Sequence, residues 1–131
     1  MGIVRVLLDT HTLLWWLFAD RRLSKRVKAV VRDPENAVVV SSASAWEIAT
    51  KYRLGRLDSA RPLVEDFQGW VRAAGFVELS IASSHAVRAG SWDVKHRDPF
   101  DRLLAAQSSM EELRLVSRDP VFASFGLEPL W

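Results

Sequence analysis

IVRVLLDTHTLLWWL, at residues 3–17, contains a strand signal, an acidic residue and a helix signal in that order. The run from Ile3 to Leu8 is rich in β-branched residues and leucine, which is typical of a strand buried in a sheet. Thr10 can cap a helix that continues to about Phe18. Asp9 therefore directly follows the first strand, at the point where the chain leaves the sheet.

Strand and helix signals continue to alternate along the rest of the chain. Further buried strands are predicted at residues 37–40 (AVVV), 76–79 (FVEL) and 113–116 (LRLV). Helices are predicted at residues 24–33, 44–54, 62–75, 83–89 and 98–112. The end of the chain is ambiguous between a helical turn and an edge strand near Leu127. This alternation predicts an α/β fold, with a parallel sheet that helices cover on both faces.

The composition indicates one compact domain over residues 1–131. About half of the residues are apolar (49%), and there is no cysteine, which excludes disulfides, thiolate zinc sites and thiol nucleophiles. The apolar stretch from Leu13 to Ala19 is too short to cross a membrane, and Arg5 and Asp9 interrupt the first apolar run. We therefore expect a soluble, cytoplasmic protein without a membrane partner. The net charge of +2 is too near balance to indicate nucleic-acid binding by itself.

Acidic residues stand where such a sheet would form a site. Ligands of parallel α/β sheets bind outside the carboxyl ends of the strands. Carboxylates gathered there would repel one another, and a hard divalent cation would relieve that repulsion. All-oxygen ligands favour Mg²⁺ or Mn²⁺ over zinc. The candidates for this cluster are Asp9, Glu47, Asp98, Asp101 and Asp119.

Each acid also has a purely structural interpretation. Asp9 can cap the first helix, and Asp98 before Pro99 can cap another. Asp119 before Pro120 is typical of a turn. Glu47 can point outward and pair with Lys51 at i+4. No single acid is specific, but the set of acids at four places in the chain favours a common site.

Other motifs carry less information. The sequence lacks a Walker A motif and a G-x-G-x-x-G motif, and its three histidines do not have zinc spacing. His11, His85 and His96 are interpreted as structural or surface residues, although His96 lies beside the acidic segment. Three tryptophans near the first and third helices, Trp15, Trp16 and Trp46, are expected mainly in the core. RNA-base stacking and an interface remain open for them.

Four segments resemble the PIN-domain nucleases, and most closely the short toxins of the VapC type. They are LLDTHTLLWWL (7–17), SSASAWEIATKYRLGRL (41–57), HRDPFDRLLAAQ (96–107) and LVSRDPVF (115–122). The terminal Leu130-Trp131 also looks like the family's usual end. The resemblance implies a PIN-like three-layer α/β/α sandwich around a parallel sheet of four to five strands.

The resemblance also implies roles for single residues. The family's four acids fall on Asp9, Glu47, Asp101 and Asp119, and Asp98 matches a further acid of this subgroup. Small supporting hydroxyls fall on Thr10, Ser41 and Ser117, the last replacing a more usual threonine. Beside these acids, Arg97 and Arg102 are candidates to hold phosphate oxygens, or else are solvated surface charges.

The implied activity is Mg²⁺- or Mn²⁺-dependent endoribonuclease action. The implied partners are RNA, a cognate antitoxin that covers the cleft, and a second copy of the chain in a homodimer. A solitary PIN nuclease and a catalytically silent PIN-fold binding module are the alternatives. Two further classes fit less well. An aspartyl-phosphate enzyme would want an aspartate where His11 stands, and a phospho-receiver would want a lysine where Arg118 stands.

Overall fold

Four parallel strands form the centre of the protein in the computed structural model, which describes residues 3–131. They are β1 (Arg5–Leu8), β2 (Ala37–Ser41), β3 (Val77–Leu79) and β4 (Arg114–Val116), in the spatial order β3-β2-β1-β4. All three pairings are parallel. β1 and β2 therefore occupy the middle of the sheet, and the carboxyl ends of all strands lie at one edge.

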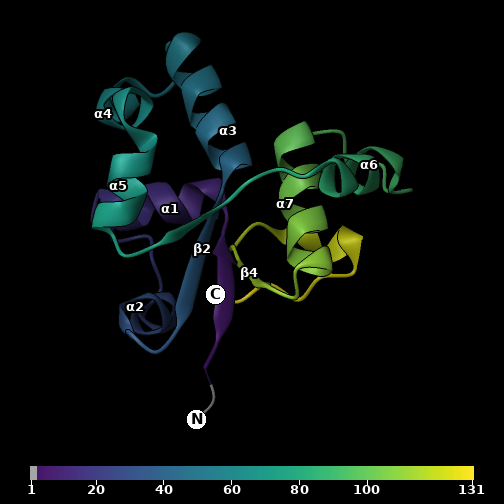
Figure 1. The fold of residues 1–131 in the computed structure, drawn as a ribbon, viewed down its shortest axis with the longest axis horizontal. Helices are drawn as coiled ribbons and strands as arrows, with labels where there is room; N and C mark the ends of the chain where they lie inside the picture. The colour runs from purple at the N-terminus through teal and green to yellow at the C-terminus, as the bar shows by residue number, and fades with distance from the viewer. Residues whose placement is uncertain (1–2) are drawn as a thin grey trace.

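Helices cover both faces of this sheet, which confirms the predicted α/β arrangement. Figure 1 shows α1, α2 and α5 on one side of the strands, α6 and α7 on the other, and α3 and α4 above their carboxyl ends. The bounds are α1 (Thr10–Leu17), α2 (Lys25–Arg32), α3 (Ser42–Arg53), α4 (Arg61–Glu65), α5 (Phe67–Ala73), α6 (Ser83–Ser91) and α7 (Pro99–Met110). Two 3-10 helices are η1 (Asp58–Ala60) and η2 (Pro120–Phe125). None of the helices within residues 3–131 is both long and apolar enough to cross a membrane.

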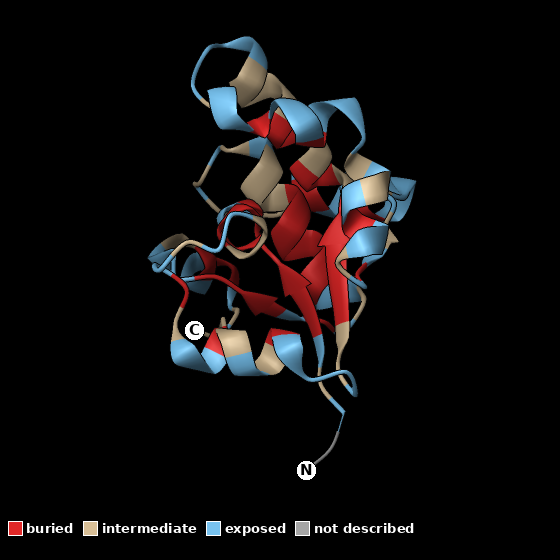
Figure 2. Cartoon of the chain, turned by 90° about the vertical axis from the view of Figure 1, so that its left-hand side faces the viewer, coloured by how far each residue is buried: buried red, intermediate tan, exposed pale blue. Residues whose placement is uncertain are grey.

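Strand β1 joins the two halves of the core because its side chains alternate between the faces of the sheet. Val6 and Leu8 pack in the cluster that includes residues of α1, α2 and α5. Leu7 packs on the other face, with Leu104 of α7 and Phe122 of η2. All three β1 side chains are fully buried, and the strands form the buried centre in Figure 2. Burial on both faces explains why this strand is a continuous apolar run.

The helix predicted at residues 62–75 is in fact two helices, and Asp66 separates them. Its backbone has left the helical region, with φ −151° and ψ 68°. The Asp66 carboxylate accepts a hydrogen bond from the backbone N–H of Gly69 at 3.0 Å and so caps α5. A side chain at position 69 would collide with this carboxylate, because a Cβ built there lies 2.1 Å from Asp66 Oδ2. The acidic cap and the glycine together stop one helix and start the next.

Three smaller expectations are also corrected. The first strand begins at Arg5 rather than at Ile3. The cap of α1 is Asp9 rather than Thr10, which is the first helical residue. At the end of the chain, the expected helical turn is present as η2, but a single parallel bridge between Val116 and Leu130 takes the place of an edge strand near Leu127.

Replacement of a β1 core residue is expected to destabilise the fold. Leu7→Ala removes methyl groups from a fully buried site and should lower the free energy of unfolding by about 2–5 kcal/mol. The matched control is Leu54→Ala, because Leu54 is half exposed (51%) and its loss should cost less than about 1 kcal/mol. Urea denaturation followed by circular dichroism measures both, and equal costs would contradict the assigned core.

Candidate functional site

The five predicted acids line one cleft at the carboxyl edge of the sheet. This cleft has a volume of about 170 Å³. Its acids come from the end of β1, from α3, from the start of α7 and from the segment after β4. The lining consists of Asp9, Thr10, His11, Glu47, Lys51, Asp98, Asp101 and Asp119. The structure thus brings together all five acids that the sequence analysis selected.

Asp9 is the buried and rigid member of this set. Its backbone N–H donates to the carbonyl of Val116 at 3.1 Å, which ties it to the end of β4. Its Oδ1 accepts the backbone N–H of Thr12 at 2.8 Å, and the Thr12 hydroxyl donates to the same Val116 carbonyl at 3.1 Å. The position of Asp9 is therefore fixed by two strands and one helix. Capping and site membership, which the sequence left as alternatives, occur together in this residue.

Glu47 and Lys51 form an ion pair inside the cleft. Glu47 is buried on α3, and its Oε2 lies 2.8 Å from Lys51 Nζ one helical turn later. Glu47 points into the cleft and still pairs with Lys51, so the outward orientation considered for this pair is wrong, whereas the pairing itself is present. The Lys51 ammonium also lines the cleft, so one positive charge already lies among the acids.

Asp98 and Asp101 occupy the first turn of α7. Asp98 caps the helix by accepting the backbone N–H groups of Phe100 at 2.8 Å and Asp101 at 3.1 Å. The Asp101 Oδ2 lies 2.8 Å from His96 Nε2. His96 therefore contacts an acid of the cleft. By contrast, His85 is buried and bonded to Glu111, which is a structural role.

Hydroxyl groups make hydrogen bonds near the acids. The Ser117 hydroxyl accepts the backbone N–H of Asp119 at 3.0 Å, and it lies near enough to the Asp9 carboxylate to lower the pKa of that group. The Thr10 hydroxyl lies 3.0 Å from that of Ser44. Ser41 caps α3 by accepting the backbone N–H of Ala43 at 2.9 Å, and it is fully buried outside the cleft lining. Thus the Thr10 hydroxyl contacts α3, which carries Glu47, and the Ser117 hydroxyl contacts Asp119. Ser41 instead orients α3 by capping it.

Burial and mutual repulsion make the cleft unfavourable for negative charge. Burial, with a smaller contribution from the nearby carboxylates of Asp98 and Glu47, raises the pKa of the Asp101 carboxyl to about 6, although the His96 hydrogen bond opposes this shift. Burial also raises the pKa of Asp9, although hydrogen bonds from Ser117 and Thr12 oppose this shift. A site that disfavours its own charges in this way would gain from a bound cation.

The donor chemistry fits a hard divalent cation, but the side chains do not form a closed ligand shell. Within the described residues 3–131, no three acidic or histidine side chains are arranged to hold a metal ion. The oxygens have other partners instead. Glu47 is paired with Lys51, Asp101 with His96, and Asp119 accepts the backbone N–H of Val121 at 3.0 Å. An ion would have to displace some of these partners.

The two candidate phosphate-binding arginines differ sharply. Arg102 donates four hydrogen bonds to backbone carbonyls that precede α7, those of Ala89, Trp92, Val94 and His96. A guanidinium has five N–H donors, so almost none remain for a phosphate. This geometry argues against the phosphate role expected for Arg102. Its guanidinium instead holds the loop between α6 and α7 in place. Arg97 is exposed and keeps its candidate role.

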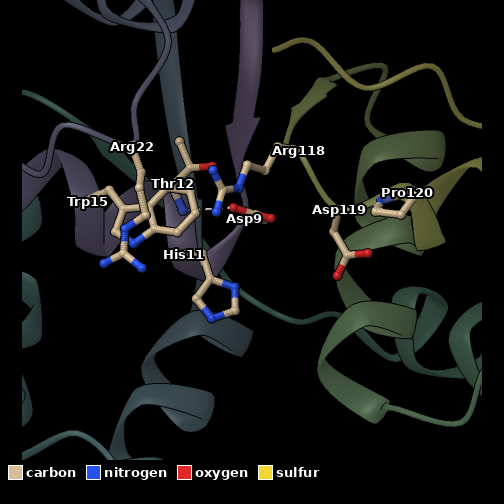
Figure 3. A pocket seen from close by; sticks show the side chains of 8 residues that line it. All are labelled: Asp9, His11, Thr12, Trp15, Arg22, Arg118, Asp119 and Pro120. Atoms are coloured by element: carbon tan, nitrogen blue, oxygen red, sulfur yellow. Dashed lines mark hydrogen bonds between the residues drawn. The ribbon is translucent and has the colours of Figure 1, made fainter.

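A second groove adjoins the acidic cleft and was not predicted. It measures about 360 Å³ and is lined by Asp9, His11, Thr12, Trp15, Arg22, Arg118, Asp119 and Pro120. Asp9, His11 and Asp119 line both hollows. Figure 3 shows the side chains of Arg22 and Arg118 approaching Trp15 from opposite sides in that view. Their carbons Cζ lie 4.7 Å (Arg22) and 4.6 Å (Arg118) from the centre of the Trp15 ring.

The tryptophans divide between core and surface. Trp15 is buried, which confirms the core interpretation for that residue, and Trp16 packs against the same core. Trp46 is half exposed (52%), with its ring against that of Phe100 at 4.5 Å between centroids. Sequence patterns could not separate these cases, because all three residues stand in apolar helical segments.

Comparison with known proteins supports the fold and the family. A family model described as PIN domain matches residues 6–127. The chain is also similar to "Ribonuclease VapC16" of Mycobacterium tuberculosis (strain ATCC 25618 / H37Rv), with 40% identity over 58 residues. That match covers 44% of this chain and 41% of the relative, so it spans about two fifths of the relative's length.

One solved structure extends this likeness to nearly the whole chain. It is "Crystal Structure of FitAcB from Neisseria gonorrhoeae", with a TM-score of 0.63 and 18% identity. The match covers 96% of this chain and 96% of that chain. At this identity the likeness concerns the fold, and it confirms the predicted PIN-like α/β/α sandwich.

Removal of the Asp101 charge is expected to stabilise the ion-free protein. The folded state holds the Asp101 proton more tightly than the unfolded state, in which the pKa is near 3.8. Between that value and about 6, folded molecules bind more protons, so this group's contribution to stability falls as pH rises. Asp101→Asn should therefore raise the free energy of unfolding at about pH 7.5 by on the order of 1 kcal/mol, and much less near pH 4.

Thermal unfolding in EDTA at both pH values checks this expectation. Asp58→Asn, at an exposed position in η1, is the control and should show little change at either pH. A gain for Asp101→Asn that is the same at both pH values would contradict the assigned cause.

Loss of the Arg102 guanidinium is expected to loosen residues 92–98. Arg102→Met leaves four carbonyls without their donor and should cost about 2–4 kcal/mol. Hydrogen exchange should rise in residues 92–98 first. Arg97→Met, at the exposed neighbour, should leave both measurements unchanged, and equal effects of the two variants would refute the structural role.

Proposed function

The chain belongs to the PIN domain family, and from this premise we propose that it is a metal-dependent endoribonuclease that acts as the toxin of a toxin–antitoxin pair. The observation that carries this proposal is the single cleft lined by five carboxylates. A ribonuclease name on a relative with 40% identity over 58 residues supports it. The raised pKa of Asp101 supports it as well, since it marks a site that disfavours excess negative charge.

Asp9 is proposed as the central ligand of Mg²⁺ or Mn²⁺. It is held by backbone contacts to β4 and α1, and rigid positioning favours metal binding. We assign Asp101 and Asp119 to complete the ligand set, directly or through water. Glu47 ligates the ion or positions the attacking water, and Asp98 contributes charge while capping α7. The bound ion would acidify a water for attack on a phosphodiester and stabilise the leaving oxygen.

The proposed partners are RNA, a cognate antitoxin and a second copy of the chain. The antitoxin is proposed to place a basic side chain in the cleft. The Lys51 ammonium 2.8 Å from Glu47 shows that the cleft accommodates a cationic nitrogen. The half-exposed Trp46 ring is a suitable contact for either protein partner, because tryptophan is enriched at interfaces.

Asp9→Asn is expected to reduce RNA cleavage to the level of a blank without enzyme. The amide keeps the size of the side chain and its capping oxygen but removes the charge that would bind the ion. Cleavage of labelled RNA is measured with Mg²⁺ or Mn²⁺ and again in EDTA. Binding of Mn²⁺, measured by titration calorimetry, should weaken in parallel.

The control for this experiment is Asp58→Asn, an exposed acid outside the cleft. It should cleave RNA like the wild type. Wild-type rates for Asp9→Asn in controlled divalent ion would refute the assignment. A wild-type protein that binds RNA but never cleaves it would favour the silent binding module, and cleavage that no genetically neighbouring protein inhibits would favour the solitary nuclease.

A further inference from the structure

The groove beside the acidic cleft combines acids with arginines, so its lining is less negative than that of the cleft. Two guanidinium groups, those of Arg22 and Arg118, lie over the ring of Trp15. They come from distant places in the chain, the loop after α1 and the segment after β4. We propose that this groove binds the backbone phosphates of the RNA strand next to the cleaved bond, with Arg118 and Arg22 as the phosphate contacts. This inference rests on the proposed function, because it concerns the same substrate.

Arg118 has no acidic partner although acids surround it. Within residues 3–131, its guanidinium makes no ion pair and no hydrogen bond, and it lies over the Trp15 ring. Asp9 and Asp119 line the same groove. A stacked guanidinium is held in place by cation–π attraction while its N–H donors stay available. This is the arrangement that a bidentate phosphate contact requires.

Arg22 is held in place by an acid and still presents a free edge. Its Nε and Nη2 donate to the two oxygens of Asp20, at 3.0 and 2.7 Å. The pairing lowers the pKa of Asp20 to about 2, so the ion pair persists at neutral pH. Nη1 has no hydrogen-bond partner among the residues that the structure describes. Asp20 therefore orients Arg22 and leaves one side of the guanidinium for a ligand.

Shared lining residues relate the acidic cleft, the groove and a third hollow to one another. The acidic cleft shares Asp9, His11 and Asp119 with the groove, and the groove shares Arg22 with a further hollow of about 620 Å³. That third hollow is lined by residues 19–22, which include Arg21. The charged lining thus changes from five acids and one lysine in the cleft, to two acids and two arginines in the groove, to one acid and two arginines in the third hollow. A polyanion would be repelled by carboxylates at one end, and the arginines would offset this repulsion along the flanking strand.

Binding is tested without cleavage, with a short fluorescein-labelled single-stranded RNA in EDTA, by fluorescence anisotropy. Arg118→Gln and Arg22→Gln should each weaken binding about tenfold at low salt. Each should also reduce the slope of log K against log salt by about 0.7, the value for one lost phosphate contact on a single strand. Arg32→Gln is the control, because exposed Arg32 ends α2 just before β2 begins, at the opposite edge of the sheet.

Further arms separate the possible results. Arg118→Lys should restore the salt slope but only part of the affinity, since ammonium lacks the planar donor pair. Affinities for Arg118→Gln and Arg22→Gln that match Arg32→Gln would overturn the proposal. A salt slope that Arg118→Lys fails to restore would also overturn it. So would poly-glutamate that competes with the labelled RNA as effectively as unlabelled RNA of the same charge. Failure of the nuclease assignment is distinguishable, because it appears as absent cleavage in Mg²⁺ or Mn²⁺ while the anisotropy results stand.

Discussion

The parallel pairing of β1 with β4 is the constraint on which the site depends. It brings the carbonyl of Val116 next to the start of α1, where that one oxygen accepts both the Asp9 amide and the Thr12 hydroxyl. Ser117 and Asp119 follow immediately, so two acids more than a hundred positions apart meet at one edge. The sheet fixes the positions of the strand ends, and the segments directly after β1 and β4 bring Asp9 and Asp119 to the cleft. Without this register the acids would be separate helix caps and turn residues.

Most of the site acids serve the fold and the cleft at once. Asp9, Asp98 and Asp119 each accept backbone N–H groups at the start of a helix. The positive end of a helix favours a carboxylate there, which offsets part of the repulsion that the acids impose on one another. Capping also orients each side chain toward the strand ends. The structural and functional interpretations of these residues are therefore not alternatives, because the cap is what fixes the carboxylate in the cleft.

The sequence was sufficient to predict the sheet and the set of acids, since both depend on local signals. A buried strand followed by Asp9 is visible as an apolar run with an acid after it. Arg102 was less predictable, because its partners are backbone carbonyls, and nothing in residue identity shows where those point. The split at Asp66 depended on a competition between a side-chain cap and helix continuation. The groove around Trp15 was missed because it is built from residues that have no common motif.

The ion pair between Lys51 and Glu47 has a consequence for the folding of the ion-free protein. A cluster of carboxylates without any countercharge would repel itself in the folded state. Here the chain places its own ammonium group among the acids, one helical turn from Glu47, and this charge offsets part of their repulsion. If the cleft binds a divalent ion as proposed, that ion would enter a site that the fold has already formed, so folding and metal binding would be separate steps.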